Sequence, residues 1–150
     1  MENSMKTPRA SAAFDNSRDR RLSILVGPVT IRVEPLVPDH PTVAEKLRSE
    51  DGLVIQGLYE PAEDAVFISP ELSSSRQAMV LLHELVHVMA DIYGFGAHSQ
   101  HFPKTEEALA RVLEPALAGL FMSNPKLSTV LYKALWDIDP IVTVPRSAKN

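Results

Sequence analysis

The segment from Leu82 to Val88 limits the fold of this chain more than any other, because it carries metal-binding residue types inside an apolar helical pattern. Its order is His-Glu-x-x-His, formed by His83, Glu84 and His87. Residues four apart share one face of a helix, so the two imidazoles can reach one ion. The glutamate lies about 100° around the helix, where its carboxylate reaches a metal-bound water without binding the metal. The spacing predicts Zn²⁺ bound by His83 and His87, with Glu84 as the catalytic base.

Apolar residues surround this motif and predict that its helix is buried. Their spacing of three and four residues is typical of a helix that packs on a core. The predicted stripe consists of Met79, Leu82, Val86, Met89 and Ala90. Polar side chains in such a place are costly unless they are paired. Two histidines and a glutamate there therefore favour a metal site, and the alternative is a pair of core histidines satisfied by hydrogen bonds.

A zinc site needs a third protein ligand, and the chain has no cysteine to provide it. The downstream candidates are His98, His101, Glu106 and Glu107. The helix that begins at Thr105 has an apolar stripe of its own. Glu106 falls on that stripe, whereas Glu107 falls on the polar side of the same helix. A carboxylate directed into the core beside two histidines is best explained as a ligand. We therefore predict Glu106 as the third ligand and hold Glu107 in reserve.

A longer metal motif with three histidines does not fit this chain. It would require glycine at position 90 and histidine at position 93, where the chain has Ala90 and Tyr93. The candidates to steady an oxyanion are His98, His101 and Tyr59. Asp91, four residues after His87, either orients a ligand imidazole or is a solvated residue near the end of the helix.

Composition excludes several classes of protein. The chain has 150 residues, 45% of them apolar and 23% charged, as expected for one globular domain. Its net charge of -4 disfavours a nucleic-acid binder. No apolar run approaches the roughly 20 residues that cross a bilayer. The polar N-terminus lacks the apolar segment of a secretory signal, so we expect a cytoplasmic protein without a membrane partner.

The order of the predicted elements indicates an α+β fold, with strands first and helices later. We expect a disordered leader at 1–20, one domain at 21–138 and a C-terminal tail at 139–150. The expected strands are Leu22–Val26, Val29–Val33, Leu53–Tyr59 and Ala65–Ser69. The expected helices are Thr42–Ser49, a long one from the Ser73–Ser75 caps to Gly94, one from Thr105 to about Met122, and a last one from Asn124-Pro125 to near Trp136.

Several segments within residues 53–128 resemble a known family. They include Val66-Phe67-Ile68-Ser69-Pro70, the His-Glu-x-x-His segment, Thr105-Glu106-Glu107-Ala108 and Asn124-Pro125-Lys126-Leu127. Together they are similar to small phage- and prophage-encoded zincin-like proteins of the ImmA/IrrE metallopeptidase group. The resemblance implies a minimal zincin: a small sheet, a motif helix, and a following helix that donates a glutamate ligand.

By position, the resemblance assigns His83, His87 and Glu106 or Glu107 as zinc ligands and Glu84 as the base. It also implies that the strand before the motif helix, Ala65–Ser69, lies along the cleft and pairs with an extended peptide.

These observations lead us to expect a zinc-dependent peptide-bond hydrolase of phage or prophage type, acting on a peptide or protein. The alternative is a binding module, in which a structural or vestigial zinc site supports a fold that acts through a protein partner. Apolar residues of the last helix belong either to the core or to a dimer surface. They are Leu127, Val130, Leu131 and Leu135.

Overall fold

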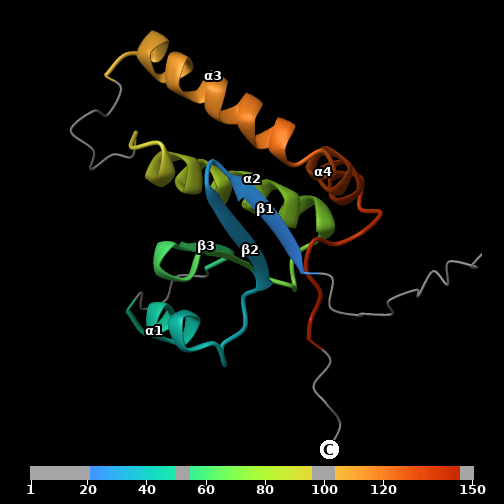
Figure 1. The fold of residues 1–150 in the computed structure, drawn as a ribbon. Helices are drawn as coiled ribbons and strands as arrows, with labels where there is room; N and C mark the ends of the chain where they lie inside the picture. Colours follow the sequence, from blue (N-terminus) through green and yellow to red (C-terminus); the bar gives the residue numbers. More distant parts are fainter. Residues whose placement is uncertain (1–20, 50–54, 96–103, 146–150) are drawn as a thin grey trace, which may run out of the picture.

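The computed structural model describes residues 21–49, 55–95 and 104–145, which form a four-stranded sheet with helices packed around it (Figure 1). The strands are β1 (Leu22–Val26), β2 (Val29–Pro35), β3 (Gly57–Glu60) and β4 (Ala65–Ile68). Across the sheet their order is β1-β2-β4-β3. The β1–β2 and β3–β4 pairs are antiparallel, whereas β2 and β4 are parallel. In the described part of the chain, β3 is therefore an edge strand.

Two tight turns account for the antiparallel pairs. Gly27, between β1 and β2, has φ of 54°, a conformation that glycine adopts at no steric cost. A short 3-10 helix, η1 (Pro61–Glu63), joins β3 to β4, and Asp64 ends it in the left-handed region. Aspartate is one of the few residues that tolerate this conformation. Both turns lie between strands that the sequence predicted.

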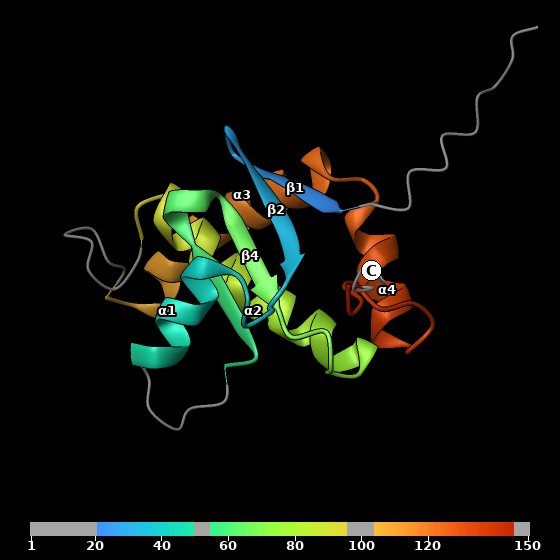
Figure 2. The ribbon, with the colours of Figure 1, turned by 90° about the horizontal axis from the view of Figure 1, so that it is seen from below.

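Helices cover both faces of the sheet. Successive residues of a strand point to opposite sides, so a strand whose residues are all apolar needs cover on both. Val66 and Ile68 of β4 face helix α2 (Ser74–Ile92) and belong to the main core. Phe67 faces the other way and packs with Val43 of helix α1 (Pro41–Ser49). Figure 2 shows α1 and α2 on opposite sides of the sheet. Every residue of β4 is buried, as expected for an internal strand.

Helices α3 (Glu106–Ser123) and α4 (Leu127–Leu135) complete the main core. Helix α3 packs on β1, and α4 packs on α2. The side chain of Asn124 lies between α3 and β1: its amide donates to Leu25 O at 2.6 Å, and its Oδ1 accepts from Leu25 N at 2.7 Å. The sequence predicted Asn124 as part of the cap of the last helix, but its side chain instead satisfies β1, and Lys126 takes the N-cap position without a side-chain bond.

The C-terminal segment is held to α2 by the buried side chain of Gln77. Its Oε1 accepts from the backbone N–H groups of Ile141 and Val142 at 2.9 and 3.0 Å. Its Nε2 donates to Leu72 O and Val142 O. Val142 is itself part of the core, so the ordered structure continues past residue 138, into the segment 139–150 expected to be a tail.

The predicted α+β class is confirmed, with differences at particular elements. Strand β3 runs from Gly57 to Glu60 rather than over residues 53–59, of which 53 and 54 lie outside the described residues, as does the expected leader at 1–20. On the last helix Leu127 and Leu131 belong to the core, whereas Leu135 is exposed. None of the helices in the described ranges is long and apolar enough to cross a membrane.

Replacing Gln77 with leucine should destabilise the protein by roughly 2–4 kcal/mol, because buried backbone groups of Leu72, Ile141 and Val142 would lose their partners. Urea unfolding followed by circular dichroism measures the change. The exposed Arg111→Ala variant is the control, and it should change stability by less than about 0.5 kcal/mol. A Gln77→Leu loss no larger than that of the control would contradict the assigned role.

Candidate metal centre

Helix α2 places two histidines one turn apart on its solvent side. The helix begins where Ser73 Oγ accepts from the backbone N–H of Arg76. Both His83 and His87 are exposed. Their Nε2 atoms face each other at 3.2 Å, and the rings meet edge to face with centroids 4.9 Å apart. The two Nε2 atoms are therefore close enough to contact one ion.

This separation fits a shared metal ion. With Zn–N bonds of about 2.0–2.1 Å, two nitrogens of a tetrahedral site lie roughly 3.3 Å apart. A hydrogen bond between the two rings would need one Nε2 to be protonated, whereas a metal uses both lone pairs. The donor types and the 3.2 Å distance of His83 and His87 thus match two ligands of a zinc site.

Glu84 is the buried residue of the motif and lies beside His83 on the wall of one pocket. Only 8% of this residue is exposed, and its carboxylate accepts a hydrogen bond from the backbone N–H of Tyr59 in β3. Burial raises the pKa of the Glu84 carboxyl above its usual value, and His87, His83 and the hydrogen bond offset this only in part. A carboxylate with a raised pKa takes up a proton more readily near neutral pH, which suits a general base.

Gly57 allows strand β3 to approach Glu84. A Cβ atom built on Gly57 would lie 2.4 Å from Val80 Cγ1 and 2.9 Å from Glu84 Oε1. Both distances are shorter than real contacts, so a larger residue would push the strand and helix apart. Sequence reasoning did not single out Gly57. A glycine within a predicted strand, which often marks close approach of another group, was the available signal.

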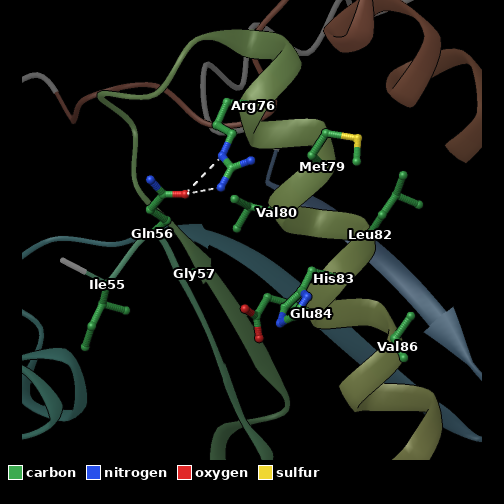
Figure 3. Close-up of a pocket in the computed structure, with 10 residues that line it drawn as sticks. All are labelled: Ile55, Gln56, Gly57, Arg76, Met79, Val80, Leu82, His83, Glu84 and Val86. Carbon is green, nitrogen blue, oxygen red and sulfur yellow. Dashed lines mark hydrogen bonds between the residues drawn. The ribbon is translucent and has the colours of Figure 1, made fainter. Parts of the chain in front are cut away.

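A pocket of about 700 Å³ opens beside Glu84, between α2 and the start of β3 (Figure 3). Its wall on the strand side is Ile55, Gln56 and Gly57, and its wall on the helix side includes His83 and Glu84. The helix also contributes apolar side chains that remain open to solvent: Met79 is 52% exposed and Val86 48%. The pocket therefore combines the candidate base with an apolar lining.

The rotation of α2 differs from the one predicted. The helix does pack on the core, but through Ala78, Leu81, Leu85, Val88 and Met89. Met79 and Val86 of the predicted stripe face solvent instead. The helix has adjacent apolar pairs such as Leu81 and Leu82. An apolar side can therefore be drawn through either residue of a pair, and the sequence suits two rotations of the helix equally well. The two histidines consequently lie on the exposed side, and Glu84 is the buried member of the motif.

The third ligand is not settled by the described residues. His98 and His101 lie outside them, and so does the side chain of Glu106, whose backbone begins α3. Glu107 is exposed and pairs with Arg111 at 3.0 Å, on the polar side where the helix phase predicted it. Within the described ranges, no three His, Asp or Glu side chains gather closely enough to hold a metal.

Asp91 is exposed near the end of α2, as one of the two interpretations of this residue had it, and it forms a hydrogen bond with Tyr59. The Tyr59 hydroxyl donates to Asp91 Oδ2 at 3.0 Å. Burial, and then the hydrogen bond and charge of Asp91, raise the pKa of Tyr59 to about 12, so its hydroxyl stays protonated at neutral pH. Tyr59 is not among the described residues that line the pocket. Its hydroxyl thus links β3 to the end of α2 and is not directed at the pocket as an oxyanion donor.

The strand expected along the cleft is also corrected. The resemblance implied the strand at 65–69, but β4 is paired on both sides, with β2 and β3. The strand next to the pocket is β3, through Gly57. Its outer edge has no partner strand within the described part of the chain. An extended peptide could therefore add to β3 but not to β4.

Comparison with protein-family models found one match, to the IrrE N-terminal-like domain (Peptidase_M78), over residues 39–144. This range includes α1, β3, β4 and all three later helices, and so the whole candidate site. A search of curated proteins found no match. A search of solved structures found none either.

Gly57→Ala should destabilise the protein by about 1–3 kcal/mol, because the added methyl group collides with Val80 and the Glu84 carboxylate. Urea unfolding measures this loss. Gly119→Ala in α3 is the matched control: its added Cβ has only Tyr93 Oη within 4 Å, at 3.8 Å, so it should be neutral or stabilising by up to about 1 kcal/mol. Equal effects of the two substitutions would show that β3 does not approach α2 closely.

Proposed function

Because this chain belongs to the IrrE N-terminal-like peptidase family, we propose that it is a zinc-dependent metallopeptidase in which His83 and His87 bind the metal and Glu84 is the catalytic base. The observation that carries this proposal is the arrangement of the motif on α2, where the two exposed histidines lie next to the buried glutamate. The two Nε2 atoms converge at 3.2 Å, while the neighbouring carboxylate faces the pocket.

Glu106 remains the proposed third ligand, with Glu107 in reserve. The ion pair of Glu107 with Arg111 supports this order, since a carboxylate already paired on the exposed side of α3 is less available to a metal.

The residues of the chain account for the proton transfers that peptide hydrolysis needs. Zinc, when bound, would lower the pKa of a water toward ~7 and polarise the carbonyl of the bond to be cleaved. Glu84 would accept the proton of the attacking water and then return it to the leaving amine. The hydrogen bond from the Tyr59 backbone N–H keeps the carboxylate directed along β3 during both transfers.

The substrate in this proposal is an extended segment of peptide or protein. It would pair with the outer edge of β3 and place its side chains in the apolar pocket formed by residues such as Met79 and Val86. The phage or prophage origin implied by the resemblance remains a prediction about the role of such cleavage, as does a cytoplasmic location.

The alternative class is a binding module whose zinc site is structural or vestigial. In that case the fold would act through a protein partner and cleave nothing. A structural zinc site is closed, and its removal unfolds a small domain, whereas a catalytic site exchanges its metal without loss of the fold.

Purified wild-type protein should contain about one zinc ion per chain by mass spectrometry, falling to near zero in His83→Ala and His87→Ala. Glu106→Ala should lower the zinc content in the same way, and Glu107→Ala should do so only if the reserve assignment is correct. The exposed Glu114→Ala is the matched control and should retain the metal. Wild type that neither contains zinc nor binds it on titration would contradict the metal site.

Glu84→Gln should retain zinc while the rate of peptide cleavage falls by at least ~100-fold, because glutamine cannot accept the proton of the attacking water. A library of internally quenched peptides provides the assay, and zinc content is measured on the same sample. Glu114→Gln makes the same chemical change at an exposed position and should leave the rate unaltered. An undiminished rate in Glu84→Gln would remove this residue from the mechanism.

A further inference from the structure

Arg76 stands at the end of the pocket away from the histidines (Figure 3). It projects from the first turn of α2 across the pocket toward the chain just before β3. Its Nε and Nη2 atoms both donate to Gln56 Oε1, at 3.0 and 2.8 Å. Gln56 is in turn anchored to the sheet, because its carbonyl oxygen accepts from the backbone N–H of Ser69 at 2.9 Å.

The charge of Arg76 is not neutralised within the described part of the chain. None of the ion pairs there involves it, and its partner Gln56 is a neutral amide. Both of its bonds go to one oxygen on the Nε–Nη2 side of the guanidinium group. The Nη1 side keeps donors in the planar arrangement that matches a carboxylate. Gln56 therefore orients the guanidinium group without using its charge.

The start of α2 is not itself the anion receptor. Two backbone N–H groups of its first turn already have partners: Ser75 N donates to Asp137 Oδ1, and Arg76 N donates to Ser73 Oγ. An anion at this end of the pocket would therefore be bound by the side chain of Arg76. The positive end of the helix would add to the attraction without providing the bonds.

The position of Arg76 sets its distance from the reaction centre. Arg76 and His83 are seven residues apart on one helix, which is roughly 10 Å along its axis at 1.5 Å per residue. An extended peptide covers this length with about three residues. Strand β3 runs in the same direction as α2. Gln56, just before the strand, contacts Arg76 at the start of the helix. Tyr59, near the end of the strand, contacts Glu84 and Asp91 further along the helix. A peptide antiparallel to β3 would thus have its C-terminal part at Arg76.

We propose that Arg76, oriented by Gln56, determines substrate specificity by binding a peptide carboxylate about three residues to the C-terminal side of the cleaved bond. The carboxylate is either the side chain of an aspartate or glutamate or the free end of the chain. This inference rests on the proposed peptidase function, because it uses His83 to locate the bond. Arg76 is a binding residue here and takes no part in the proton transfers.

Peptide binding tests this assignment without relying on turnover. The protein is the full chain with Glu84→Gln, and the probes are fluorescein-labelled peptides with two consecutive leucines. One amidated peptide has glutamate as the third residue after the first leucine, and a second has glutamine there. A third ends at that glutamine with a free carboxylate, which separates the two sources of the negative charge.

Fluorescence anisotropy measures the affinity of each peptide. We expect roughly tenfold tighter binding than that of the amidated glutamine peptide for the glutamate peptide, the free-ended peptide or both, and this ratio of affinities is the readout. Adding Arg76→Gln should bring this ratio close to one, and so should Gln56→Glu, which supplies a competing carboxylate to the guanidinium group. Arg32→Gln removes an equal charge outside the pocket and should preserve the ratio. A ratio near one with Arg76 present, or one that survives its loss, overturns the proposal.

A charge reversal separates recognition from a merely structural role. Arg76→Glu places an acidic residue in the first turn of α2, where negative charge favours the helix, so the variant should fold. Its preference should change to a peptide with lysine at the same position. Cleavage assays on chains with Glu84 intact distinguish the two proposals. Arg76-dependent binding without any cleavage would defeat the peptidase function and leave Arg76 as a residue that binds a peptide carboxylate. Cleavage indifferent to the acidic residue would overturn the specificity role alone.

Discussion

The close contact between helix α2 and strand β3 is the constraint on which the rest of the site depends. Gly57 has no side chain, so the strand backbone comes within reach of Val80 and the Glu84 carboxylate. The Tyr59 N–H then satisfies that carboxylate, which is otherwise costly to bury. Once Glu84 occupies this position, the rotation of α2 is determined. His83, one residue earlier, must point about 100° away, toward solvent.

Buried polar groups determine the orientation of α2 at two points along its length. Near the start of the helix, Gln77 uses its whole amide to bond the chain at Leu72, Ile141 and Val142. Further along, Glu84 bonds β3. Both face the body of the protein from one side of the helix, because seven residues make nearly two turns. Apolar burial favours packing of α2 in several rotations, whereas these directional bonds select one of them.

The same selection explains why the pocket is apolar yet open. Since Leu81, Leu85 and Val88 pack inward, apolar residues on the opposite side of α2 face outward. Met79 and Val86 are consequently exposed, and they lie beside the candidate metal ligands. An exposed apolar surface next to a buried carboxylate and an uncompensated arginine is more typical of a binding site than of ordinary protein surface.

The sequence by itself determined the α+β class, most element boundaries and the pairing of His83 with His87, because these depend on local spacing, caps and turns. It did not determine which residues of α2 are buried, since adjacent pairs such as Leu81 and Leu82 suit two rotations equally. Nor did it show that β3 rather than β4 lies at the pocket, or that Gln56 meets Arg76, twenty residues away. Those features depend on contacts between segments distant in the chain, which only the tertiary structure brings together.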